Sequence, residues 1–261
     1  FIYLISSDDD KCSIDATISQ TATSIDEDSS STIDFTISFE GTTSKDITYT
    51  VETSGSATEG TDYQSIDDVT VSGETGSFSI TLIDDSISDI NETIDLTLTA
   101  VDKGTELCDE TLTSNTITII DDEAAPTITL AASASSIAEN AGSSITLTAT
   151  SSIISGSDIT VSFDTSGTAT EGTDYGTISD ITISAGSTTG TTSFTPTDDS
   201  MYETSTDETA TVAIDTVSGG SATENGTQSV TITINENESA PTVTLAASGT
   251  SIAENAGSSI T

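Results

Sequence analysis

The sequence predicts an all-β chain of tandem immunoglobulin-like Greek-key β-sandwiches, and two observations carry this prediction. Apolar residues recur at every second position over short stretches, as from Ile33 to Phe39, which is the period of a half-buried strand. In addition, the segment from Pro126 to Thr146 returns almost unchanged from Pro241 to Thr261, roughly 115 residues later, as expected of a repeated domain.

The strands of each repeat follow from the same period of two. In the first repeat the alternating stretches cover 33–39, 47–51, 78–82, 94–98 and 117–119, and in the second they cover 145–147, 159–163 and 230–234. No window has a helical period. Because Gly, Ser and Asp separate the stretches, we expect about seven short strands per repeat, in two antiparallel sheets packed face to face.

The repeats divide the chain into four parts. We expect an apolar segment with a linker at 1–11, a first domain at 12–123, a second at 124–238 and the incomplete start of a third repeat at 239–261. No stretch is long and apolar enough to span a membrane. Three interpretations remain open for Phe1 to Ile5: the remnant of a targeting segment, an added strand for a partner's sheet, or, as we favour, the last strand of an upstream domain.

The charge balance excludes several classes of partner. The chain has 44 acidic and three basic residues, no His, and a net charge of -41. Nucleic acids and anionic membranes are therefore poor partners. From residue 104 onward there is no basic side chain, so the carboxylates there depend on water, counterions or bound metal. Scattered acids are typical of a solvated surface, whereas clustered acids require a separate explanation.

The acids gather at four places in each repeat. They follow the first strand, precede the Tyr of a Gly-Thr-Asp-Tyr turn, fill a loop after a middle strand, and follow the last strand. If the four places share one pole of the sandwich, two carboxylates 4 Å apart repel by roughly 4 kcal/mol at an effective dielectric near 20. A divalent cation would remove this repulsion.

Calcium fits such a pole better than other metals. It accepts six to eight oxygen ligands in irregular geometry, whereas magnesium requires a near-ideal octahedron. Zinc and copper are disfavoured because His is absent and the two Cys are not spaced as ligands. The loops also lack the pattern of an EF-hand.

Two motifs in a fixed order resemble a known family. The turn reads Gly-Thr-Ala-x-x-Gly-x-Asp-Tyr from Gly167 to Tyr175 and, with Ser56 in place of Thr, from Gly55 to Tyr63. An Asp-Asp-x-x-x-Glu-x-x-Glu loop follows, in which Asp89 replaces the first Glu of the first repeat, and the loop of the second repeat is two residues longer. Both repeats resemble Calx-β domains, the calcium-binding sandwiches of sodium/calcium exchangers, integrin β4 and many bacterial surface proteins.

The resemblance implies Ca²⁺ ligands in both repeats. In the first they are Glu27, Asp62, Asp84, Asp85, Asp89, Glu92, Asp121, Asp122 and Glu123. In the second they are Glu139, Asp174, Asp198, Asp199, Glu203, Glu208, Glu236 and Glu238. The exit of the second repeat also contains Asn235 and Asn237, which carry no charge, so we expect weaker binding there.

We expect a structural, non-catalytic role at the cell surface. A carboxylate pair is the one acid-base arrangement left without His, but glycosidase sites need sugar-stacking aromatics and the chain has no Trp. Nearly identical repeats favour a calcium-stiffened stalk of a large adhesin over the alternatives, a module that binds a receptor or glycan directly and a metal-free acidic spacer. The expected partners are neighbouring repeats of the same chain and a surface or anchoring protein.

Two further features have open interpretations. Cys12 opens the first strand and Cys108 precedes the last, and in this kind of sandwich these strands are usually neighbours. The pair is either a disulfide or two buried thiols. Asp85-Ser86-Ile87, Asp199-Ser200-Met201 and Asp215-Thr216-Val217 resemble the O-glycosylation motif of Bacteroidota, which would suit a gliding or surface adhesin of that group.

Overall fold

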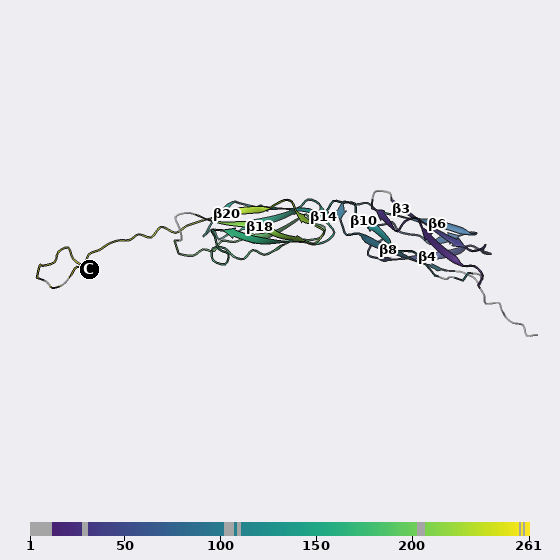
Figure 1. Cartoon of the computed structure of the whole chain (residues 1–261), viewed down its shortest axis with the longest axis horizontal. Helices are drawn as coiled ribbons and strands as arrows, with labels where there is room; N and C mark the ends of the chain where they lie inside the picture. Colours follow the sequence, from purple (N-terminus) through teal and green to yellow (C-terminus); the bar gives the residue numbers. More distant parts are fainter. Residues whose placement is uncertain are drawn as a thin grey trace, which may run out of the picture.

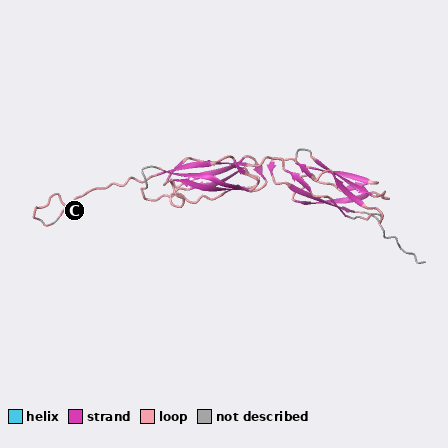
Figure 2. Cartoon of the chain, in the orientation of Figure 1, coloured by secondary structure: helices cyan, strands magenta, loops and turns pink. Residues whose placement is uncertain are grey.

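The chain folds into two β-sandwiches that lie end to end. The computed structural model describes residues 12–27, 31–101, 107–108, 111–202, 207–255, 257 and 259–261, and all regular structure in them is β-strand (Figure 1; Figure 2). The predicted fold class is confirmed. The segment 1–11 lies outside the described residues. In the part of the chain that is described, no helix has the length and apolar character needed to cross a membrane.

The first sandwich packs a sheet in the order β1-β3-β6 against a sheet in the order β2-β10-β8-β4-β5, in which β9 also pairs with β8. The strands are β1 (Ala16–Gln20), β2 (Ser24–Asp26), β3 (Thr32–Phe39), β4 (Ile47–Gly55), β5 (Val69–Val71), β6 (Thr75–Thr81), β8 (Glu92–Ala100), β9 (Thr111–Thr113) and β10 (Ile117–Ile120).

The second sandwich repeats this plan, with one sheet in the order β17-β13-β11-β19 and the other in the order β12-β20-β18-β15-β16. The strands are β11 (Thr127–Ala132), β12 (Ser136–Ala138), β13 (Ile145–Ser151), β15 (Ile159–Gly167), β16 (Ile181–Ile183), β17 (Thr189–Phe194), β18 (Glu208–Ser218), β19 (Thr223–Glu224) and β20 (Ser229–Asn235).

The sheets are not purely antiparallel, which corrects one expectation. The first strand of each domain is split between the two sheets, as β1 and β2 or as β11 and β12. The second half of the split strand pairs in parallel with the last strand, β2 with β10 and β12 with β20. In the second domain β11 also pairs in parallel with β19. Parallel neighbours end at the same edge of a sheet, and this property positions the acidic loops described below.

The alternating residues form a separate core in each sandwich. In β3 the odd-numbered residues from Ile33 to Phe39 are buried, as the period of two predicts. Phe35 stacks on Phe78 with ring centroids 4.8 Å apart. The even-numbered residues point outward and include Thr and Ser hydroxyls, so a narrow apolar layer supports a polar surface.

The Tyr of each Gly-Thr-Asp-Tyr turn anchors the turn in the core. Tyr63 and Tyr175 are each 1% exposed. The hydroxyl of Tyr63 donates to Thr53 Oγ1 at 2.9 Å, and Tyr175 stacks on Phe194 with centroids 4.8 Å apart. A buried aromatic group with a hydrogen-bonded polar end fixes both the depth and the orientation of the loop that carries it.

The two cysteines of the first domain are bonded to each other. Cys12 and Cys108 form a disulfide with Cα atoms 4.9 Å apart.

The start of the third repeat does not form a sheet. The described residues after Glu238 contain no strand, and Val243 and Leu245 are 97% and 100% exposed. The equivalent residues of the second repeat, Ile128 and Leu130, are buried, because the remaining strands of that domain cover them.

We predict that Tyr63→Ala lowers the free energy of unfolding by about 3–5 kcal/mol, because it leaves a cavity beneath the turn. Tyr63→Phe should cost only about 1 kcal/mol, since it removes one hydrogen bond and keeps the ring. Urea unfolding of the two variants measures the difference. Equal losses would contradict the anchoring role of the ring.

Candidate metal centre

Strand pairing brings the acidic segments of the first domain to one pole. Glu27 follows β2, and its N–H donates to the carbonyl of Ile120, the last residue of β10, at 2.9 Å. The exit segment from Asp121 therefore begins beside Glu27. Glu92 at the start of β8 lies opposite Ile119, so it belongs to the same edge.

The turn and the acidic loop join this edge through a second contact. The carbonyl of Asp62 accepts the N–H of Ile83 at 3.0 Å, which places the turn directly beside Asp84. The loop then runs through Asp85 and Asp89 back to Glu92. All nine ligands predicted for the first domain thus lie at the pole that faces the second domain.

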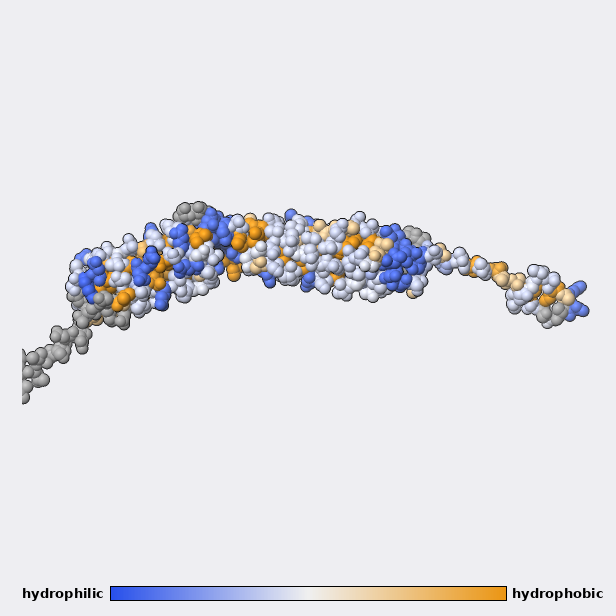
Figure 3. Space-filling view, turned by 180° about the vertical axis from the view of Figure 1, so that it is seen from behind, coloured by the Kyte–Doolittle hydropathy of each residue, from blue (hydrophilic) through white to orange (hydrophobic). Residues whose placement is uncertain are grey.

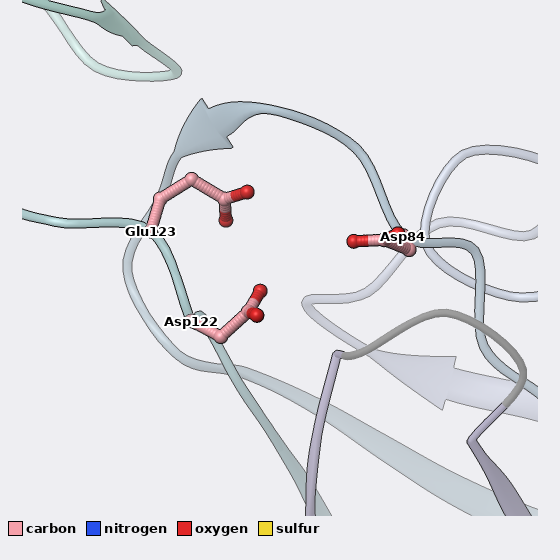
Figure 4. Close-up of side chains that lie close together, drawn as sticks. All are labelled: Asp84, Asp122 and Glu123. Atoms are coloured by element: carbon pink, nitrogen blue, oxygen red, sulfur yellow. The ribbon is translucent and has the colours of Figure 1, made fainter.

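Three of these carboxylates form the tightest group. One oxygen each of Asp84, Asp122 and Glu123 lies within 4.8 Å of the others, and the three side chains point toward a common space (Figure 4). At an effective dielectric near 20, each pair of charges at this separation repels by roughly 3 kcal/mol. Asp84 and Asp122 are exposed, so water screens part of this repulsion, and a bound cation would remove the rest.

The pKa values show how far the negative potential extends. Burial is the largest cause of a pKa of about 7 for both Glu27 and Glu92. A hydrogen bond to Asp62 and the charges of Asp62 and Asp89 raise the pKa of Glu92 further. The pKa of Glu27 is also raised by the charges of Asp85, Glu123, Asp121 and Asp62. Acids from all four segments therefore interact.

Several of the same carboxylates also organise their own loops. One oxygen of Asp62 accepts the N–H of Thr58 at 2.5 Å, and Asp85 Oδ1 accepts that of Ile87 at 2.7 Å. Asp121 Oδ1 accepts the N–H of Asp89 at 3.0 Å. Since each carboxylate has a second oxygen, the loops are held in place while ligand atoms remain.

The second domain has an equivalent pole at its far end. Glu139 N–H donates to the carbonyl of Asn235 at 3.1 Å, and the carbonyl of Asp174 accepts the N–H of Thr197 at 2.9 Å. Asp198 and Asp199 follow directly, and Glu208 starts β18 opposite Ile234. Figure 3 shows hydrophilic residues gathered at the end of this sandwich from which the C-terminal segment leaves. Glu203 lies outside the described residues.

A group of one buried and two half-buried glutamates marks this second pole. One oxygen each of Glu139, Glu236 and Glu238 lies within 4.8 Å of the others. Glu139 is 7% exposed and accepts the N–H of Asp199 at 3.2 Å. Burial is the main cause of its raised pKa. Glu238 Oε2 is shielded from solvent, and the largest cause of the raised pKa of Glu238 is a hydrogen bond with the side chain of Glu236.

The donor set at this pole fits a hard cation. Carboxylates that are held close together and partly shielded from water are costly unless a metal or proton neutralises them. Asp174 was predicted as a Ca²⁺ ligand, but one of its oxygens instead caps its own turn by accepting the N–H of Thr170 at 2.6 Å. The predicted weakening by Asn235 and Asn237 stays a prediction, but the two glutamates of this exit segment do lie in the group.

The joint between the domains contains a contact that sequence reasoning missed. Two short strands, β7 (Ile87–Ser88) in the acidic loop and β14 (Ile154–Ser155) in the second domain, pair in parallel. The N–H of Gly156 donates to the carbonyl of Ser88 at 3.1 Å. A Cβ atom at Gly156 would collide with the carboxylate of Asp89. Two-residue strands have no readable period, so no sequence signal could have identified this pairing.

Comparisons with known proteins place the chain in a family. The model of the Calx-beta domain matches residues 8–123 and again residues 121–238. No curated protein matches the sequence.

The chain is similar to several solved structures at low sequence identity. The crystal structure of CBD12 from CALX1.2 is 18% identical, with a TM-score of 0.32 over 74% of this chain and 77% of that one. The adhesin InvE of Yersinia pseudotuberculosis is 12% identical, with a TM-score of 0.39 over 85% of this chain and 59% of that one. On the evidence of the two domain matches, the chain belongs to the Calx-beta domain family.

Proposed function

We propose that the chain is a calcium-binding structural repeat that forms a stiff stalk segment of a surface protein. The observation that carries the proposal is the group of Asp84, Asp122 and Glu123, whose oxygens lie within 4.8 Å of one another at the pole between the two domains. Lys45 is the one basic residue among those described, and it lies just before the start of β4. The acids lie near the other end of this strand, where Gly55 pairs with Ile94. Among the described residues, therefore, no basic side chain lies at this pole.

Asp84, Asp122 and Glu123 would hold one Ca²⁺, and the other acids of the pole offer further oxygen ligands. At the second pole Glu139, Glu236 and Glu238 would do the same. Bound calcium supplies positive charge and accepts six to eight oxygens in flexible geometry. The side chains supply ligands whose loops are already fixed by strand pairing and by backbone hydrogen bonds to carboxylates.

Stiffness follows from the position of the first pole. The acidic loop contacts the second domain through β7 and β14, and the connection from Asp121 to Pro126 is short. Uncompensated repulsion in the loop pushes against this contact, so neutralisation by calcium favours the extended arrangement. The same chemistry recurs at the second pole, where the next repeat begins.

The disulfide supports an extracellular position, because the Cys12–Cys108 bond is typical of oxidising compartments. We further propose that neighbouring repeats are the main partners and that the chain has no catalytic activity. Its place in a gliding adhesin and its attachment to an anchoring protein stay predictions.

We predict that calcium raises the melting temperature and that chelator lowers it. At about a hundred times the dissociation constant, binding adds roughly 2.7 kcal/mol, which is on the order of ten degrees for a domain of this size. The variant Asp122→Asn/Glu123→Gln should lose the part of this shift that arises at the first pole. Glu52→Gln/Asp68→Asn, which removes two exposed acids elsewhere, is the matched control.

Small-angle scattering on the same samples tests the stalk. The maximum dimension should increase with calcium in the unmodified chain and in the control variant. If calcium changes neither the melting temperature nor the maximum dimension, the function is that of a metal-free spacer. Tight binding of a receptor or glycan by these two domains would instead favour an adhesive module.

We predict that Gly156→Ala weakens calcium binding at the first pole by roughly tenfold. Losses of this size are typical when a contact that supports a metal ligand is removed. The added methyl group displaces the carboxylate of Asp89 and disturbs the β7–β14 contact. Gly176→Ala is the control, because nothing but the Thr195 carbonyl lies near its Cβ position, at 4.0 Å. Calorimetric titration that finds the same affinity for both variants would contradict this role of Gly156.

We predict that the metal-free protein loses stability as the pH rises from about 4.5 to 7. Folded Glu27 and Glu92 have pKa values of about 7 compared with 4.5 for an ordinary Glu. The folded chain therefore binds more protons than the unfolded chain in this window, and their release on raising the pH is destabilising. Melting temperatures of chelator-treated protein should show this slope, and Glu27→Gln/Glu92→Gln should flatten it. If the melting temperature of the double variant falls with pH as steeply as that of the unmodified chain, the pH dependence comes from the net charge of the chain and not from these two glutamates.

A further inference from the structure

The disulfide joins the entry of the first domain to a point close to its exit. Cys12 and Cys108 are 96 residues apart in sequence, and every strand from β1 to β8 lies between them. The N–H of Cys108 donates to the carbonyl of Ile14 at 2.8 Å, and Ile14 forms a parallel bridge with Leu107. Of the strands of this domain, only β9 and β10 follow the crosslink.

The second domain has the same contact without the covalent bond. There the N–H of Asn225 donates to the carbonyl of Ile128 at 2.9 Å, so Ile128 takes the place of Ile14. Pro126 and Asn225 stand where the first domain has Cys12 and Cys108. Since the chain has two Cys, the second domain cannot form an equivalent bond.

We propose that the disulfide makes the first domain a load-bearing unit of limited extension, while the second domain can unravel along its whole length. Tension applied to the two ends of the chain enters the first domain at Cys12 and passes through the sulfur atoms to Cys108. The segment between them cannot be drawn out by this tension while the disulfide is intact. Only the short segment with β9 and β10 can be pulled out, by breaking its pairing with β8 and β2.

The disulfide prevents the chain between Cys12 and Cys108 from extending, and the length of this segment is large enough to measure. An extended chain spans about 3.3–3.6 Å per residue, so a separation of 96 residues corresponds to roughly 32–35 nm. The use of this device under load rests on the proposed stalk function. The mechanical property itself depends on the crosslink and its position and does not depend on calcium.

Single-molecule force spectroscopy tests this proposal on the full chain held by its two ends, at fixed calcium concentration. In oxidising buffer we expect one long release from the second domain and, from the first, a release of only a few nanometres. Reductant should lengthen the first-domain release by roughly 32–35 nm, and Cys12→Ser/Cys108→Ser should show the long release in both buffers. The second-domain release should not change in any sample.

Mass measurement with alkylation identifies the state of the cysteines in the same preparations. A full-length release of the first domain while the disulfide is intact would overturn the proposal, and so would free thiols in protein purified under oxidising conditions. Repeating the pulls in chelator separates this proposal from the proposed function. A stalk that does not respond to calcium would still show the withheld length if the crosslink acts as described.

Discussion

Repulsion among carboxylates held at one pole of each sandwich is the constraint on which the rest of the structure depends. Parallel pairing of the split first strand with the last strand makes both strands end at the same edge, so Glu27 lies beside the exit of β10 and Glu139 beside the exit of β20. The Asp of the Gly-Thr-Asp-Tyr turn and the acidic loop are then tied to that edge by backbone hydrogen bonds. The backbone thus concentrates charge that it cannot disperse, and a hard cation with many oxygen ligands relieves the repulsion best.

The sandwiches tolerate this charge because their stability comes from elsewhere. Tyr63 and Tyr175 anchor the acidic turns in apolar cores, and the first domain is closed covalently by its disulfide. At the joint, the loop that carries Asp89 is also the loop that pairs with the second domain. One segment therefore carries both a proposed calcium ligand and the contact between the domains, so calcium bound there would couple the ionic state of the pole to the shape of the chain.

The fold could be predicted from the sequence because the period of two in segments such as 33–39 is a local property. The pole was also predictable in outline, since the acids recur at matching places in both repeats. Pairing partners are a tertiary property, so the splitting of the first strand, its parallel pairing and the β7–β14 contact could not be predicted. The disulfide remained open for the same reason. Asp62 and Asp174 were expected as ligands, but their role in capping their own turns depends on loop geometry that spacing does not specify.

The most direct test of the central claim is a crystal structure of the chain grown in calcium, with anomalous scattering used to locate the ions. We expect anomalous peaks among Asp84, Asp122 and Glu123 at the joint and among Glu139, Glu236 and Glu238 at the far pole, each within coordination distance of several carboxylate oxygens. Carboxylates that point apart into solvent, with no anomalous peak between them at saturating calcium, would contradict it.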